Sequence, residues 1–114
     1  MALALNVFKT ITSISTTNFV GIYTAPVGYT GVVLLSQATN IGTETHSISV
    51  NHVRTDRVGV AVTTEILRDF PISINDSTTL ASGKLILESG DSLKISSDSN
   101  TDVKVILSIL ETLN

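Results

Sequence analysis

The sequence predicts an all-β protein: an antiparallel β-sandwich or jelly-roll-like barrel of eight to nine short strands. Three observations favour this class. Apolar and polar residues alternate with a period of two along most of the chain. Turn-forming residues recur about every ten residues, the spacing typical of sandwiches and barrels. The best helical window, residues 62–70, is too short and too rich in β-branched residues to predict an amphipathic helix.

The first half of the chain is predicted to form four strands separated by turn chemistry. A polar break at 15–18 follows the first strand. Pro26 and Gly28 end the second, because Pro removes a ladder donor and Gly permits a positive φ. The third strand is apolar on both faces, and a turn at 40–42 precedes the fourth. The predicted strands cover residues 5–14, 20–24, 29–38 and 46–54.

The second half is predicted to form five more strands, with a hairpin loop at 55–57 and a further loop at 75–79. Pro71 marks one of them as an edge strand or a bulge. The last strand is apolar on both faces, so it should lie centrally between layers or against a neighbouring subunit. The predicted strands cover residues 58–66, 70–74, 83–88, 92–97 and 103–111.

Length and composition limit the functions that the chain can have. At 114 residues the chain predicts one domain, 1–114, with residues 1–5 as an apolar N-terminal arm. A net charge of −3 and scattered basic residues predict no binding to nucleic acid or to an anionic membrane. No apolar run is long enough to span a bilayer, and the N-terminal run is too short for a signal peptide. The sequence contains no cysteine, which is compatible with a reducing compartment.

One short motif suggests an enzyme. Residues Gly90-Asp91-Ser92-Leu93 copy the signature of a family of esterases and lipases. In those enzymes the serine follows the first strand of an α/β sheet, and a histidine near the C-terminus is the base. Here no histidine follows His52, and a serine without a base is not activated. A hairpin turn is therefore the preferred interpretation.

A second motif suggests an ion site. Asp98, Asn100 and Asp102 match the first three ligand positions of a calcium loop. Val103 stands where the loop needs Gly, and Ile109 where it needs a bidentate Glu. A polar hairpin tip is therefore preferred, with a weak surface ion site as the alternative.

The remaining ionisable residues predict neither a metal nor a cofactor site. His46 and His52 lie six residues apart on one strand, roughly 20 Å, so one metal cannot bind both. His52 is expected in or beside the core with one hydrogen-bond partner. Arg54 and Arg57 are expected in a salt bridge or a subunit contact. Three carboxylates could converge across loops, although scattered carboxylates are normally solvated: Glu65, Asp69 and Asp76.

Two segments resemble small virion proteins of tailed bacteriophages, most of all those of contractile-tailed phages that infect cyanobacteria. They are residues 24–35, TAPVGYTGVVLL, and residues 82–96, SGKLILESGDSLKIS, together with 105–111, VILSILE. The resemblance covers roughly residues 20–111 and rests on turns and strand patterns. It implies a non-enzymatic β-sandwich subunit of a capsid or tail, made in the host cytoplasm and located in the virion. It provides no catalytic residues.

The leading functional hypothesis is a virion structural protein: a decoration (cement) or neck/tail-associated subunit whose partners are copies of itself and other virion proteins. Low charge and two-faced apolar strands suit surfaces that contact other protein. The residues predicted at such contacts are Met1, Leu3, Leu5, Ile106 and Leu110. The alternative is a module on a tail fibre or baseplate that binds host-surface glycan through Tyr23 and Tyr29. A hydrolase built on Ser92 is a remote third.

Overall fold

The structure, a computed structural model, describes residues 6–55 and 59–114. These residues form nine strands and no helix, hence no helix long and apolar enough to cross a membrane. The strands are β1 (Asn6–Ile14), β2 (Val20–Thr24), β3 (Tyr29–Asn40), β4 (His46–Thr55), β5 (Ala61–Ile72), β6 (Ser77–Thr79), β7 (Leu85–Leu87), β8 (Ser92–Ser97) and β9 (Val103–Leu113).

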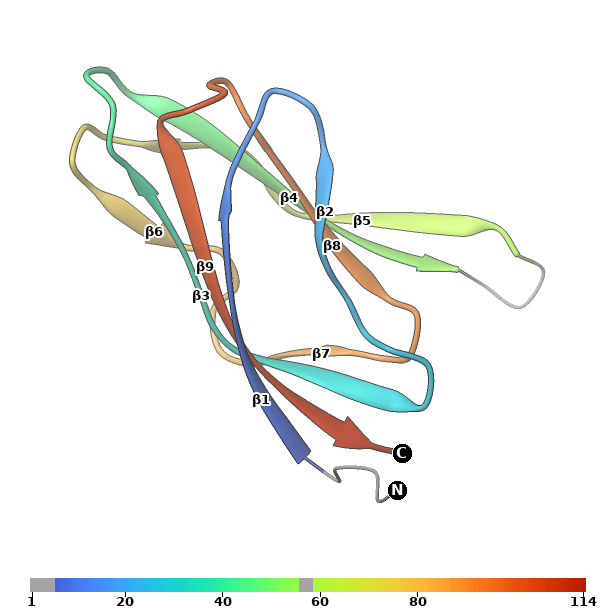
Figure 1. Ribbon diagram of the computed structural model, residues 1–114. Coiled ribbons are helices and arrows are strands. Elements are labelled where there is room, and N and C mark those ends of the chain that lie inside the picture. Colours follow the sequence, from blue (N-terminus) through green and yellow to red (C-terminus); the bar gives the residue numbers. More distant parts are fainter. Residues whose placement is uncertain (1–5, 56–58) are drawn as a thin grey trace.

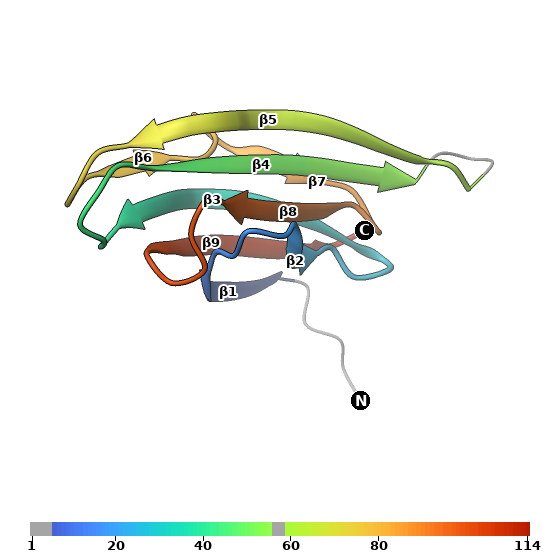
Figure 2. The same ribbon diagram turned by 90° about the horizontal axis from the view of Figure 1, so that it is seen from above.

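The strands form two antiparallel sheets that pack face to face (Figures 1 and 2). The first sheet has the order β1-β9-β3, and β6 and β7 pair with successive parts of the free edge of β3. The second sheet has the order β2-β8-β4-β5. Because β6 and β7 together occupy one strand position, each sheet has four positions. The chain crosses between the sheets in the manner of a jelly roll, which confirms the predicted fold class.

Side chains alternate between the two faces of each strand, and this alternation builds the core. In β9, Val103, Leu107 and Ile109 point inward and are at most 1% exposed. They meet Ile48 and Ile95 from the second sheet in one buried apolar cluster. Full burial of such a side chain is worth about 1.5–3 kcal/mol, so the inner faces of the two sheets hold the fold together.

The edge strand β5 differs from its prediction. The sequence predicts strands at 58–66 and 70–74, but the structure has one strand, Ala61–Ile72, whose pairing with β4 shifts register twice. Each register shift interrupts the alternation of inward and outward residues. The sequence pattern therefore predicts two strands where there is one bulged strand. Pro71 does lie on an edge strand, as expected. The predicted loop at 75–79 is also wrong in part, because Ser77–Thr79 pairs with β3 as β6.

Candidate functional site

The outer face of the first sheet carries a row of apolar side chains across four strands. The strand registers pair Phe8 of β1 with Leu110 of β9, Leu110 with Val32 of β3, and Val32 with Ile86 of β7. Paired residues point to the same side of a sheet, so these four form one continuous row. Phe8 is 74% exposed and Ile86 is 60% exposed, although both are large and apolar. With the nearby Leu35, Ile106 and Ile14 on the same side, they form what we call the apolar face.

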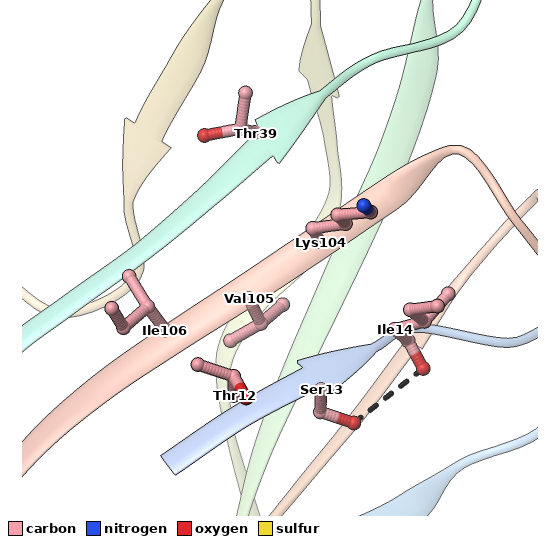
Figure 3. Close-up of a pocket in the computed structure, with 7 residues that line it drawn as sticks. All are labelled: Thr12, Ser13, Ile14, Thr39, Lys104, Val105 and Ile106. Carbon is pink, nitrogen blue, oxygen red and sulfur yellow. Dashed lines mark hydrogen bonds between the residues drawn. The ribbon is translucent and has the colours of Figure 1, made fainter. Parts of the chain in front are cut away.

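A shallow depression lies at one end of the apolar face (Figure 3). Its volume is about 410 Å3, and its lining comes from β1, β9 and β3. Ile14 and Ile106 supply apolar surface here, and Lys104 supplies the only charge among the outward-pointing residues of β1, β3 and β9 that the structure describes. A surface with so little charge resembles the centre of a protein–protein interface more than an ordinary solvated surface.

The outer face of the second sheet has the opposite character. Its outward residues are mainly hydroxyl, amide and charged side chains, which alternate with the buried residues of the same strands. They include Ser47, Ser49, Asn51, Glu65, Ser92, Lys94 and Ser96. The large exposed apolar side chains of the two outer faces are therefore concentrated on the first sheet, and the second is mainly polar. Such a subunit suits an assembly that covers the first sheet and leaves the second in water.

The predicted contact residues fall into two groups. Ile106 and Leu110 lie on the apolar face, where Ile106 is 37% exposed. Met1, Leu3 and Leu5 lie outside the described residues, so the N-terminal arm stays a prediction.

The predicted tyrosine platform is wrong for Tyr23, which is buried in the core and only 7% exposed. Its hydroxyl donates a 2.7 Å hydrogen bond to Oε2 of Glu111, whose other oxygen pairs with Nζ of Lys9 at 3.0 Å. Burial and this contact both raise the pKa of Tyr23. Burial works to raise the pKa of Glu111, but the bonds from Tyr23 and Lys9 outweigh it and hold that pKa below its usual range. Tyr29 is half-buried beside the turn at Pro26. Because Tyr23 is buried, the two tyrosines do not form a shared sugar-binding platform.

Ser92 and His52 lie on opposite sides of the sheet. In the pairing of β4 with β8, Ser92 faces Val53 and points outward, whereas His52 faces Leu93 and points inward. His52 instead contacts Oδ2 of Asp91 at 3.2 Å, the single partner that was expected for it. The hydroxyl and the imidazole therefore cannot form a nucleophile–base pair.

Asp91 is a structural carboxylate that closes the turn between β7 and β8. It is 3% exposed and accepts hydrogen bonds from the Glu88 backbone N–H at 3.0 Å and from Nη2 of Arg54 at 2.9 Å. Burial works to raise its pKa, but Arg54 and the backbone N–H outweigh that effect and lower it. Arg54 also pairs with Glu88, which confirms the salt bridge expected for it. Arg57 lies outside the described residues.

The three residues of the calcium-loop motif do not converge on an ion. Nδ1 of His46 lies 2.8 Å from Oδ1 of Asp98, and Nε2 lies 3.0 Å from Oδ2 of Asp102. Asn100 accepts a 3.0 Å hydrogen bond from the Thr17 backbone N–H. Burial works against a charged His46, but the two carboxylates outweigh it and raise the pKa of the ring. The motif is the polar hairpin tip preferred from sequence, held by the His46 ring, which sequence analysis did not assign to it.

Two of the three carboxylates that could converge across loops border the same depression, and the third does not. Glu65 and Asp69 line one depression on the outer face of the second sheet, whereas Asp76 closes a turn by accepting from the Ser77 backbone N–H at 2.8 Å. This depression could not be predicted from the sequence, because it forms where β5 is bulged. The irregular alternation around Ile66 and Leu67 was the only available signal.

No protein-family model and no curated protein matches the sequence. A chain of the T13 IBDV viral particle matches the fold with TM-score 0.58 at 9% identity, over 97% of this chain and 32% of that chain. A chain in the acidic stable capsid of Helicobacter pylori bacteriophage KHP30 matches with TM-score 0.55 at 13% identity. That match covers 96% of this chain and 89% of the KHP30 chain. A Bacillus endospore appendage, from a family of disulfide-linked pili, matches with TM-score 0.53 at 14% identity. That match covers 100% of this chain and 97% of the appendage chain. This chain thus spans about a third of the IBDV chain, and at these identities the likeness establishes a shared fold.

Proposed function

We propose that this chain is a structural subunit of a tailed-phage virion: a non-enzymatic decoration (cement) or neck/tail-associated protein. The observation that carries the proposal is the apolar face on one side of a molecule whose other side is polar. Copies of this chain, or other virion proteins, would cover that face. Contacts of modest strength that symmetry repeats many times stabilise a particle without any single strong site.

The energetics of the apolar face support a covered state. Full burial of a side chain of this size is worth about 1.5–3 kcal/mol. Phe8 and Ile86 are each more than half exposed, so most of that free energy is unrealised in the isolated subunit. Large exposed apolar patches on soluble proteins usually mark interaction sites.

The structural comparisons support a virion more than other assemblies. This chain is similar to the KHP30 capsid chain in length as well as in fold, as expected for a small subunit of a phage head. The endospore appendage is similar in length too, but its pili are disulfide-linked and this sequence contains no cysteine. The segments at residues 24–35 and 82–96 resemble small virion proteins of tailed bacteriophages, which supports a tailed-phage virion in particular. A single domain over residues 1–114 is part of the proposal.

A double variant, Phe8→Ser with Ile86→Ser, tests the proposed surface. The control is Val27→Ser, which makes the same kind of change at a residue that is 91% exposed in the loop between β2 and β3. Molar mass is measured by light scattering over a concentration series, with circular dichroism to confirm folding. We expect wild type and control to form the same oligomer and the double variant to dissociate. The virion role is tested by mass spectrometry of particles from the genome that encodes the chain; its absence from those particles would refute the role.

A further inference from the structure

A second depression lies on the polar side of the molecule, over the second sheet. Its volume is about 330 Å3, which is within the range of sites for small molecules. Phe19 borders it from the segment just before β2, Asn51 from β4, and three charged residues from the edge strand β5. These three are Glu65, Arg68 and Asp69. We call this depression the β5 hollow.

Two bulges in β5 create the hollow. Ile48 pairs with Phe70 and Val50 with Leu67, so Arg68 and Asp69 together lie opposite the single residue Ser49. Asp69 takes a left-handed backbone conformation with φ 48°, which is unusual for a residue other than glycine. Its N–H donates to Oγ of Ser49 at 2.9 Å, and that hydroxyl approaches Oδ1 of Asp69 at 3.3 Å. The bulge therefore brings both residues to the hollow, and the contacts with Ser49 hold Asp69 in place.

The polar groups of the hollow are open to solvent and only loosely paired with one another. In the part of the chain that the structure describes, the half-buried amide of Asn51 makes no side-chain hydrogen bond. Glu65 and Arg68 form an exposed ion pair at 3.6 Å, which is longer than a hydrogen bond and leaves both groups open to other partners. The hollow thus presents an amide, a carboxylate and a guanidinium, which together can both donate and accept hydrogen bonds.

Protection of a sheet edge explains part of this arrangement. Bulges and charged residues on an edge strand prevent unwanted pairing with other strands, and β5 is such an edge. That role does not require an unpartnered amide on β4, which is an inner strand of the sheet. It also does not require Phe19, which is 48% exposed and lies at the far side of the hollow from β5.

We propose that the β5 hollow binds a hexopyranose unit of a neutral polysaccharide. Neighbouring sugar hydroxyls both donate and accept, so they match a carboxylate, an amide and a guanidinium that line one hollow. The C–H face of the ring suits the exposed ring of Phe19. Two carboxylates against one guanidinium disfavour a phosphate or another anion.

The site goes beyond the proposed structural role and is independent of the apolar face. The hollow lies on the outer face of the second sheet, so covering the first sheet leaves it open to solvent. A virion subunit of this kind would hold the particle with one side and contact polysaccharide with the other. Sugar binding by the isolated protein and its molar mass are separate measurements, so either proposal can fail alone.

The test is a titration of the 15N-labelled protein with the methyl α-pyranosides of glucose, galactose and mannose, followed by NMR. At least one sugar should give saturable shift changes at the amides of residues 49–51, 65 and 68–69. Asn51→Ala and Glu65→Gln should each weaken binding by about tenfold, because each removes hydrogen bonds to the sugar. Phe19→Ala should weaken it similarly.

Thr63→Ala is the matched control, since Thr63 is exposed on the same side of β5 but outside the hollow. It should bind as wild type does. The proposal is overturned if none of the three sugars shifts these amides. It is also overturned if Asn51→Ala and Glu65→Gln bind as wild type, or if inorganic phosphate binds at the hollow and the sugars do not.

Discussion

Replacing Tyr23 with Phe removes one hydroxyl from the core and nothing else. That hydroxyl donates to Glu111 across the two sheets, since Tyr23 is on β2 and Glu111 is on β9. Glu111 is 3% exposed, and Lys9 would remain its charged partner. Gly31 leaves room for the ring, because a Cβ at this position would lie 2.8 Å from the Tyr23 hydroxyl. The substitution therefore tests a specific contact that joins the sheets.

The expected loss of stability is about 1.5–3 kcal/mol, the usual contribution of a hydrogen bond to a charged group. An unfolding entropy of about 2.1 cal/mol/K per residue makes 1 kcal/mol equivalent to about 4 °C in a chain of 114 residues. Tm should therefore fall by roughly 6–12 °C at neutral pH. Urea unfolding followed by circular dichroism measures the free energy directly, and a double-mutant cycle with Glu111→Gln isolates the pairwise contribution.

The loss of stability caused by Tyr23→Phe should become smaller as pH falls. The pKa of Glu111 is lower in the folded than in the unfolded state, so its contribution is present above the ordinary carboxyl pKa of about 4.3. It is lost as pH falls through the folded value. Tyr23→Phe removes a hydrogen bond that lowers the pKa of Glu111. The free energies of unfolding of wild type and variant should therefore converge in acid. A loss below about 0.5 kcal/mol, or a difference that grows in acid, would refute the assigned role of this bond.

Two further predictions concern the histidine at the hairpin tip and the two faces of β9. The pKa of His46 is raised in the folded state, so its contribution is complete below the unfolded value of about 6.5 and is lost as pH rises through the folded value. Tm of wild type should fall over that alkaline range, and His46→Gln should remove the fall; an equal fall in both proteins would contradict the ion contacts with Asp98 and Asp102. Leu107→Ala should cost about 2–5 kcal/mol because this side chain is fully buried. Ile106→Ala, one residue away on the outer face, should cost about 0.5 kcal/mol or less, and equal losses in urea unfolding would show that the assigned faces are wrong.

Most of the fold could be predicted because local alternation determines which residues are buried. Seven of the nine predicted ranges overlap separate observed strands, and the exceptions have a physical cause. The bulges in β5 shift the alternation at Ile66 and Leu67, so the sequence does not show that the strand continues. The short strand β6 pairs through only three residues, Ser77–Thr79, whose polar side chains are typical of a loop.

The contacts between distant residues could not be predicted. His46 is more than fifty residues from both of its carboxylate partners, and Tyr23 is 88 residues from Glu111. Nothing in the local pattern around Tyr23 separates a buried tyrosine from an exposed one, because one neighbour, Ile22, is apolar and the other, Thr24, is polar. The β5 hollow depends on a register shift, which is a property of strand pairing and has no sequence motif.

The apolar face follows from combining the sequence pattern with the number of layers in the fold. A strand that is apolar on both faces can be buried within one chain only if a second layer covers its other side. This fold has two layers, so β9 and β3 can each bury one face against the second sheet and no more. Ile106, Leu110 and Val32 therefore have no intramolecular layer to pack against among the described residues. In a two-layer sandwich, a second apolar face on a central strand is better explained by contact with another molecule than by the stability of the subunit itself.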